Sequence, residues 1–91
     1  MNNAPAKLVA IGDQNFTQFF SLLGVDVILV PEMESMPEQV LSASHDHGIA
    51  ALVLQAEYCD PAASWYDQLV VSQKPFTTLP GWNHGQVTEK I

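Results

Sequence analysis

The sequence predicts a small α/β domain built on a doubly wound, four-stranded parallel sheet of strand order 2-1-3-4, with helices on both faces. Short apolar runs alternate with segments of helical periodicity, and this alternation is typical of parallel sheets with helical crossovers. The run Ile49–Leu54 contains no polar residue, as expected for a parallel strand that is buried on both faces. The chain has 91 residues, of which 47% are hydrophobic, and this predicts one domain over 1–91.

Hydrophobic periodicity predicts the first three elements, after a flexible terminus at 1–6. Lys7–Ile11 is a short apolar run followed by a turn, so it predicts the first strand. Asp13 is placed to cap the helix that follows and Gly24 to end it. The helical spacing predicts an inner face made of Phe16, Phe19, Phe20 and Leu23. The β-branched run Val25–Val30 predicts the second strand.

Proline, glycine and apolar spacing predict the remaining elements. Pro37 suits the first turn of a second helix that ends at Gly48, with Val40, Leu41 and Ser44 on its inner face. Asp60-Pro61 predicts a cap and the first helical position of a third helix, whose inner residues are Trp65, Leu69 and Val70. Phe76–Leu79 predicts the fourth strand, and 82–91 a short C-terminal helix. The expected arrangement is flavodoxin-like or receiver-like.

The charge balance of the chain excludes several classes of partner. Ten carboxylates stand against three lysines (Lys7, Lys74 and Lys90) and no arginine, so the net charge is −7. Binding to nucleic acid or to an anionic membrane surface requires clustered cations, which this sequence does not contain. The sequence also has no signal-peptide core and no apolar run long enough for a membrane helix. A cytoplasmic protein without direct membrane insertion is therefore expected.

In a doubly wound sheet, ligands bind beyond the carboxyl ends of the strands, where the strand order reverses. A receiver domain needs an aspartate after the third strand, but Gln55 stands there and an amide cannot form an acyl phosphate. A phosphate-binding loop after the first strand is not indicated, because only Gly12 is present and Asp13 would repel phosphate. We therefore expect no catalytic residue and no small-molecule substrate. The predicted edge consists of Gly12, Asp13, Gln14, Asn15, Pro31, Gln55, Ala56, Glu57 and Pro80.

Two carboxylates at this edge, Asp13 and Glu57, offer a candidate magnesium site, since two carboxylates with waters are a minimal set of ligands. The alternative is that Asp13 caps the first helix and that Glu57 is a solvated loop residue. His45 and His47 lie two positions apart, so on a helix they point in different directions and do not converge on one ion. His84 is distant in sequence, and no metal or other cofactor is expected.

Cys59 and Trp82 complete the candidates. Cys59 is the only cysteine, which excludes an internal disulfide. Its neighbours Glu57 and Asp60 would raise the pKa of the thiol, so an unreactive, buried or half-buried cysteine is expected. Trp82 follows Pro80 and Gly81 in a polar turn, where it either anchors a protein contact or folds back over the fourth strand. Protein–protein binding is the predicted function.

Three blocks of the sequence, taken together and in order, match the motifs of one protein family. The first block is LVAIGDQNFTQFFSLLGVDVILV, where Ile11, Gly12, Asp13, Phe20, Leu22, Gly24 and Val25 match. The second is HGIAALVLQAEYCD, where Gly48, Ile49 and Glu57 match, and the third is KPFTTLPG, where Pro75, Leu79, Pro80 and Gly81 match. On these residues the chain resembles the F-subunits of V-type and A-type rotary ATPases (ATP synthases). The chain departs from the family at Gln55-Ala56, where the family has threonine, and in the short segment Gln86–Ile91, where the family has a longer helix.

The resemblance implies a non-catalytic subunit of a central rotor stalk, which binds the coiled-coil shaft subunit and supports ATP-coupled ion transport. It places the partner-binding residues in the turn after the fourth strand and in the C-terminal segment: Pro80, Gly81, Trp82, Gln86, Val87, Lys90 and Ile91. One alternative is a degenerate receiver-like interaction module without a phosphorylation site. Another is an enzyme that uses a metal or small molecule at the Asp13 and Glu57 edge.

Overall fold

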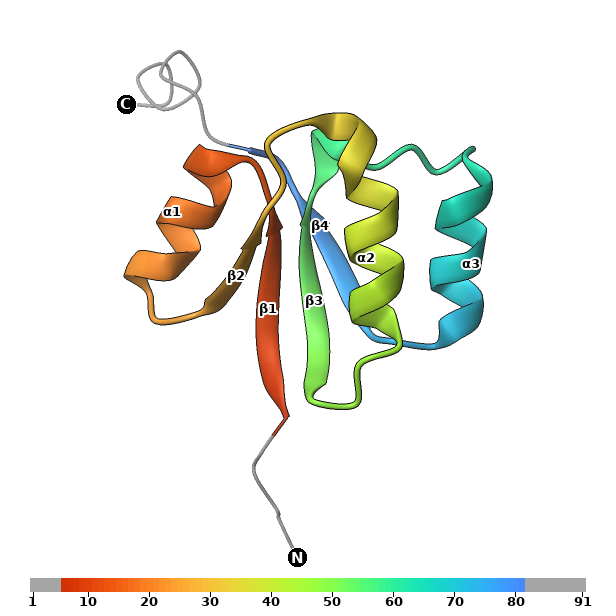
Figure 1. The fold of residues 1–91 in the computed structure, drawn as a ribbon, viewed down its shortest axis with the longest axis horizontal. Coiled ribbons are helices and arrows are strands. Elements are labelled where there is room, and N and C mark those ends of the chain that lie inside the picture. The colour runs from red at the N-terminus through yellow and green to blue at the C-terminus, as the bar shows by residue number, and fades with distance from the viewer. Residues whose placement is uncertain (1–5, 82–91) are drawn as a thin grey trace, which may run out of the picture.

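The computed structural model describes residues 6–81, which form a four-stranded parallel sheet (Figure 1). The strand order is β2-β1-β3-β4, so the predicted doubly wound, flavodoxin-like fold is confirmed. The strands are β1 (Lys7–Gly12), β2 (Asp26–Leu29), β3 (Ile49–Gln55) and β4 (Phe76–Leu79). The helices are α1 (Gln14–Leu22), α2 (Met36–Ser44) and α3 (Ser64–Ser72), and two short 3₁₀ turns are η1 (Met33–Ser35) and η2 (Ala56–Tyr58).

The two ends of the chain fall beyond this range. The C-terminal helix expected within 82–91 lies outside the described residues. Of the N-terminal segment 1–6, which we expect to be flexible, only Ala6 is described. Among the described residues, every helix is too short, or too polar, to cross a lipid bilayer.

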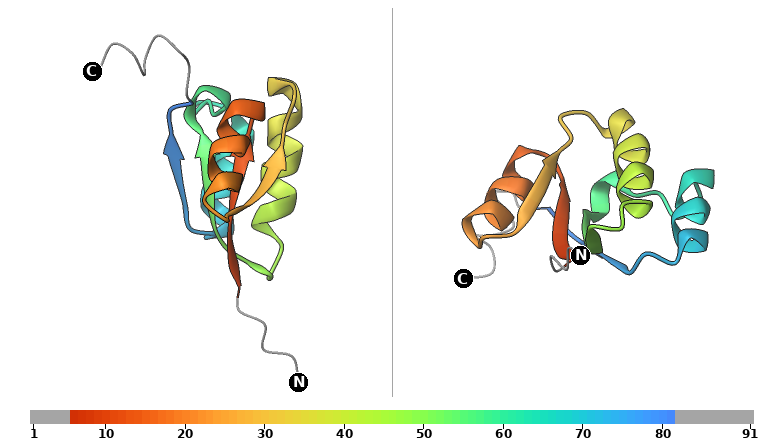
Figure 2. Two further views of the ribbon diagram at one scale, coloured as in Figure 1. Left: turned by 90° about the vertical axis from the view of Figure 1, so that its left-hand side faces the viewer. Right: turned by 60° about the horizontal axis from the view of Figure 1, so that its bottom comes forward.

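The helices form two layers, one on each side of the sheet (Figure 2). From β1 the chain first moves to β2 in one direction and then passes back over β1 to β3 and β4 in the other. Right-handed crossovers therefore place α1 on one face and place α2 and α3 together on the opposite face. The prediction of helices on both faces is confirmed.

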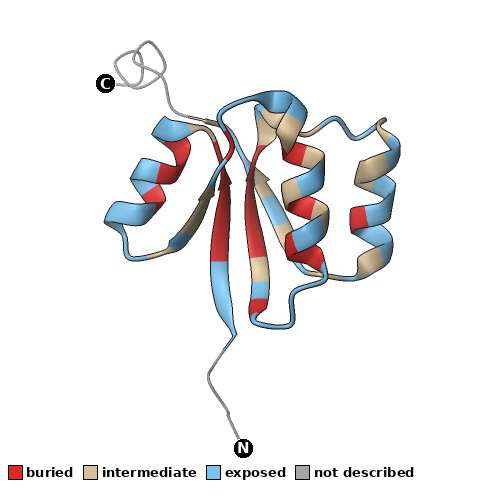
Figure 3. Ribbon diagram, viewed as in Figure 1, coloured by how far each residue is buried: buried red, intermediate tan, exposed pale blue. Residues whose placement is uncertain are grey.

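Each face of the sheet has its own core (Figure 3). Side chains alternate along β1, so Val9 and Ile11 point to one face and Ala10 to the other. The larger cluster lies under α2 and α3 and contains Val9, Ile11, Val30, Met36, Val40, Ala43, Ile49, Leu52, Leu54 and Leu69. The smaller cluster lies under α1 and contains Ala10, Phe16, Phe20 and Val53. Burial on both faces of β3 is limited to Leu52–Gln55, since Ala50 is exposed.

The predicted inner face of α1 is correct for Phe16 and Phe20 and wrong for Phe19 and Leu23. Leu23 is 63% exposed because the helix ends at Leu22 and no further turn reaches the sheet. Phe19 is 37% exposed, and the third inward position is instead Thr17. The Thr17 hydroxyl donates to the backbone carbonyl of Asp13 at 2.9 Å, which allows this polar residue to be buried.

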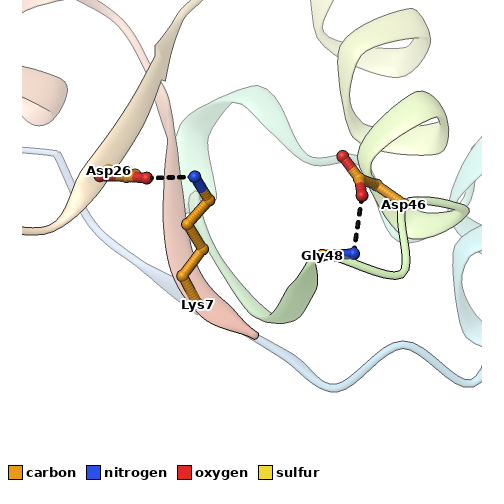
Figure 4. A network of polar contacts seen from close by, with 4 residues as sticks. All are labelled: Lys7, Asp26, Asp46 and Gly48. Carbon is orange, nitrogen blue, oxygen red and sulfur yellow. Dashed lines mark hydrogen bonds and ion pairs between the residues drawn. The ribbon is translucent and has the colours of Figure 1, made fainter. Parts of the chain in front are cut away.

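The predicted end of α2 is wrong, because the helix stops at Ser44 and not at Gly48. His45 follows as the C-terminal cap, and Gly48 belongs to the next turn, where its N–H donates to the Asp46 carboxylate at 2.8 Å (Figure 4). His45 and His47 are both exposed at this amino-terminal edge of the sheet. They lie at the end of the molecule opposite to the carboxyl edge.

The predicted start of α3 is also wrong. Asp60 forms a local turn instead of a cap: its carboxylate accepts a hydrogen bond from the Ala62 N–H at 3.0 Å, so the helix begins only at Ser64. Leu69 is fully buried and Trp65 packs against the core, as predicted. Val70 is 54% exposed, because it is rotated by about 100° from Leu69 around the helix.

Both lysines of the described range lie at the amino-terminal edge of the sheet. Lys7 forms an ion pair with Asp26 at 2.8 Å, and the hydrogen bond and charge of Asp26 raise the pKa of the ammonium group (Figure 4). Lys74 donates to the backbone carbonyls of Asp46, at 2.9 Å, and of Ile49. The positive charge of this range is therefore held at one end of the domain.

Candidate functional site at the carboxyl edge of the sheet

The carboxyl ends of β1, β3 and β4 bring together residues that are far apart in the sequence. Asp13 follows β1, Gln55 ends β3 and Glu57 lies in η2 directly afterwards. Gly81 lies just beyond the end of β4. The strand order places these positions side by side at the point where the order reverses, which is where a doubly wound sheet binds its ligands.

Gln55 fills the reversal point with its own side chain. The residue is 5% exposed, and its side-chain Oε1 accepts a hydrogen bond from the Asp13 N–H at 2.8 Å. Its Nε2 donates to Asp13 Oδ2 at 3.1 Å. The amide thus engages both the backbone and the carboxylate of Asp13, so a pair of residues occupies the position where a ligand would otherwise meet both strands.

Asp13 is the N-terminal cap of α1, as predicted. Its Oδ1 accepts a hydrogen bond from the Phe16 N–H at 2.9 Å, which satisfies one of the unpaired donors in the first turn of the helix. Because Oδ2 accepts from Gln55, protein donors engage both carboxylate oxygens.

Glu57 is exposed, but its carboxylate is also engaged by the protein. Its Oε1 accepts a hydrogen bond from the Gly81 N–H at 2.8 Å, which links η2 to the end of β4. Three of the four oxygens of Asp13 and Glu57 therefore accept hydrogen bonds from the protein. No cluster of three or more metal-ligating side chains occurs within residues 6–81. The arrangement favours the capping interpretation of Asp13 over the magnesium hypothesis.

Two glycines make room for the Gln55 side chain. A Cβ atom at Gly12 would lie 2.7 Å from Gln55 Oε1 and 2.6 Å from the Phe16 ring. A Cβ atom at Gly81 would lie 2.6 Å from Gln55 Nε2. Since such distances are shorter than van der Waals contact, a larger residue at either position would displace the amide from Asp13.

Tyr58 and Cys59 line the same edge and stay protonated near neutral pH. Burial raises the pKa of the Tyr58 hydroxyl, and the charges of Asp13 and Glu34 raise it further. The half-buried Cys59 thiol donates to the Gln55 carbonyl at 3.4 Å, and burial raises its pKa to about 11. The predicted upward direction of the Cys59 pKa is correct, but burial and not the charge of its sequence neighbours is the main cause.

Acidic residues gather at this edge because the helices begin here. Helix N-termini carry a partial positive charge that stabilises nearby carboxylates. Of the nine carboxylates in the described range, two lie at the amino-terminal edge, Asp26 and Asp46. The other seven follow strands or lie in the first turns of helices at the carboxyl edge, and they are Asp13, Glu32, Glu34, Glu38, Glu57, Asp60 and Asp67.

An open depression of about 310 Å³ lies beside the reversal point, between α1 and the end of β2. Its walls are Asp13, Gln14, Asn15, Leu29 and Pro31. It carries a single carboxylate, which the protein itself already engages, together with two side-chain amides and two apolar residues. Asp13 is the one acidic side chain in the lining, and its two carboxylate oxygens accept hydrogen bonds from Phe16 and Gln55.

The candidate partner-binding residues are divided between the described and undescribed parts of the chain. Pro80 is exposed and Gly81 is half-buried at the carboxyl edge. The remaining five, Trp82, Gln86, Val87, Lys90 and Ile91, lie outside the described residues, as does His84. The two orientations considered for Trp82 thus remain predictions.

Sequence reasoning did not identify the bonds from Gln55 to Asp13 and from Glu57 to Gly81. The contact between Gln55 and Asp13 could in principle be predicted, because strand order 2-1-3-4 makes β1 and β3 neighbours and both residues stand at the strand ends. The second pair depends on η2, a short turn without a sequence signal.

The sequence and the structure were compared with known proteins. No family model, no curated protein and no solved structure matches the chain.

Proposed function

We propose that this protein is a non-catalytic subunit of the central stalk of a rotary V-type or A-type ATPase, where it binds the coiled-coil shaft subunit. In this role it supports ATP-coupled ion transport and is peripheral to the membrane. The proposal starts from the three blocks that resemble the F-subunits of these enzymes.

The observation that carries the proposal is where these blocks lie in space. The first block contains β1 and β2, the second β3 and the third β4, so the blocks meet in one sheet although they are separated in the sequence. The matching residues Asp13, Glu57 and Gly81 lie at one edge of the sheet, and the Gly81 N–H donates a hydrogen bond to Glu57. Asp13 is bonded instead by Gln55, where the chain departs from the family. Blocks that form one connected unit are a stronger basis for a family resemblance than three isolated short motifs.

A second point in favour is the chemistry of the edge. In the described range the carboxylates of Asp13 and Glu57 are used within the protein, and Gln55 stands where a receiver has its phospho-acceptor. An assembly role requires no reacting group at this position.

The test is co-purification of the full chain with the coiled-coil shaft subunit encoded by the same genome. We expect a complex that elutes together in size-exclusion chromatography. Val87→Asp, in the proposed partner-binding segment, should weaken it, whereas Leu22→Asp, at an 80% exposed position on α1, should not. If the wild-type protein elutes separately from the shaft subunit, the proposal is wrong.

A degenerate receiver-like interaction module is the second candidate, and Gln55 is the observation that favours it. Its buried amide replaces a phospho-acceptor while Asp13, typical of a receiver, is kept. This function predicts an interface on α1 and β4, so here Leu22→Asp should abolish partner binding and Val87→Asp should not.

A further inference from the structure

β4 is an edge strand whose outer side pairs with no strand of the described part of the chain (Figure 2). The Leu52 N–H donates to the Pro75 carbonyl at 2.9 Å, and Leu52 stands opposite Phe76 in the ladder. In a parallel ladder this pattern turns the backbone groups of Thr77 toward β3 and those of Phe76 and Thr78 toward the outside. The outer side of β4 therefore presents N–H and C=O groups that a further strand can bind.

The two edges of the sheet differ in how they are protected against such pairing. β2 begins with Asp26, which forms the exposed ion pair with Lys7, and charge on an edge strand disfavours further pairing. β4 consists of Phe76–Leu79 and contains no charged residue, no proline and no shift of register. Its aromatic and β-branched residues favour the extended backbone. The sheet is thus open to extension at β4 and protected at β2.

Apolar side chains flank the open edge on both faces of the sheet. The Tyr66 ring of α3 meets the Phe76 ring edge-on, with the ring centroids 5.6 Å apart. Val70 lies one turn further along α3 on the same side as Tyr66, and it is 54% exposed. Leu79 points to the opposite face of the sheet and is 41% exposed. A strand added to β4 would bring apolar contacts as well as backbone hydrogen bonds.

We propose that β4 pairs antiparallel with β4 of a second copy of this chain, which joins two sheets into one. An antiparallel ladder between identical strands has two-fold symmetry, the usual symmetry of dimers of identical chains. With the axis at Thr77, the outward backbone groups of Phe76 face those of Thr78 in the second copy. The two Thr77 side chains then meet across the axis, and the exposed flanks of the two α3 helices approach each other.

Strand length and charge favour a second copy as the occupant of this edge. Pro75 and Pro80 confine β4 to four residues, and a second β4 has the same length and the same outward groups. Antiparallel pairing also directs the acidic carboxyl edge of each copy toward the amino-terminal edge of the other. Lys74 lies there, and among the described residues its ammonium group is held by backbone carbonyls and not by a carboxylate. Its charge therefore attracts the acidic edge of the second copy.

The inference goes beyond the proposed function and does not depend on it. It concerns the chain in the absence of the shaft subunit, and every residue that carries it lies within the described range. Because β2 is protected, assembly should stop at the dimer.

The test is sedimentation equilibrium of the full chain alone, from micromolar to millimolar concentration. We expect the mean mass to rise with concentration from that of the monomer to that of the dimer. Thr78→Pro removes an outward N–H that makes no bond to β3, and proline is tolerated at such positions of edge strands. This variant should dimerise about tenfold more weakly, with a melting temperature in dilute solution close to that of the wild type.

A matched pair of variants on α3 tests the interface without a change in the sheet. Val70→Lys places a charge in the apolar contact and should weaken dimerisation by about tenfold. Val71→Lys introduces the same charge at a 78% exposed position that is turned away from β4, and it should dimerise like the wild type. If Thr78→Pro does not fold, this pair decides the result.

Hydrogen exchange measured by NMR shows directly whether β4 is the strand that pairs. The Phe76 and Thr78 amides should exchange rapidly in dilute solution and become protected as the concentration rises. The Thr77 amide, which faces β3, should be protected at every concentration.

Each possible result supports or overturns the proposal. A dimer that Thr78→Pro and Val70→Lys weaken and Val71→Lys does not, with protection of Phe76 and Thr78 that depends on concentration, supports it. A monomer at all concentrations overturns it, and protected Phe76 and Thr78 amides in that monomer would show that the same chain covers its own edge. Equal effects of the two lysine variants, or growth beyond the dimer, overturn it as well. All these outcomes leave binding to the shaft subunit to be tested separately.

Discussion

Replacing Gln55 by glutamate tests the hydrogen-bond geometry of the carboxyl edge with almost no change in shape. In the wild type, Gln55 Nε2 donates to Asp13 Oδ2 at 3.1 Å. In Gln55→Glu this donor becomes a carboxylate oxygen, so two negative charges face each other at a buried position. Two unit charges about 4 Å apart repel each other by about 4 kcal/mol at an effective dielectric constant of about 20.

The expected loss of stability depends on pH, because the new carboxyl group escapes the repulsion by taking up a proton. Its pKa in the folded protein should lie above the ordinary value for glutamate of about 4.3, so the loss is absent at low pH and grows as the pH rises toward the folded pKa. At about pH 5, protonating the new carboxyl group costs only about 1 kcal/mol, so the variant loses no more than about 1 kcal/mol of its free energy of unfolding. At about pH 8 protonation would cost about 5 kcal/mol, so the group stays charged and the full loss of about 4 kcal/mol is expected.

The assay is a urea titration monitored by circular dichroism at both pH values. At each pH the free energy of unfolding of the variant is compared with that of the wild type. Gln55→Met is the matched control: it has a similar shape, lacks the hydrogen bonds and carries no charge. Its free energy of unfolding should be about 1–3 kcal/mol below that of the wild type, and this difference should be the same at both pH values. A pH-independent loss for Gln55→Glu, or no loss at about pH 8, would show that the amide does not face the Asp13 carboxylate.

Three other predictions concern the core, the thiol and the metal hypothesis. Leu69→Ala should reduce the free energy of unfolding by about 2–5 kcal/mol, because the side chain is fully buried. Val70→Ala, at the adjacent exposed position, should change it by about 0.5 kcal/mol or less, and denaturant titration of both variants checks this. Alkylation of Cys59 at about pH 8 should be much slower than in urea-unfolded protein, because burial raises the pKa of the folded thiol to about 11; equal rates would contradict the burial. Millimolar MgCl₂ should leave the melting temperature equal to that in NaCl of the same ionic strength, and a specific rise would restore Asp13 and Glu57 as metal ligands.

The fold was predictable because its strands are short, apolar and separated by clear breaks. Phe76–Leu79 matches its predicted bounds, and Ile49–Leu54 differs from the observed strand by one residue. Helix ends were less predictable, because several local hydrogen-bond patterns compete for the same residues. Asp60 followed by proline is compatible with a helix cap and with a tight turn, and the bond from the Ala62 N–H determines that the turn forms.

The candidate site could be predicted in its location and not in its contacts. Strand order places Asp13 and Gln55 together, but the direction of the amide depends on rotamers and on the space left by Gly12. The prediction that an amide at Gln55 excludes acyl-phosphate chemistry needed only its chemical identity. That the same amide also holds the cap of α1 is a property of the folded chain.

The separation of charge between the two edges of the sheet affects how the molecule meets other proteins. Within the described range, Lys7 and Lys74 balance Asp26 and Asp46 at the amino-terminal edge, so the whole surplus of seven carboxylates lies at the other end. The domain therefore behaves as an oriented electric dipole, and a basic surface attracts it by the carboxyl edge before any contact forms. This attraction extends about 10 Å at an ionic strength of about 0.1 M and is shorter in stronger salt. Association with a basic partner is therefore faster at low salt, and the carboxyl edge arrives first.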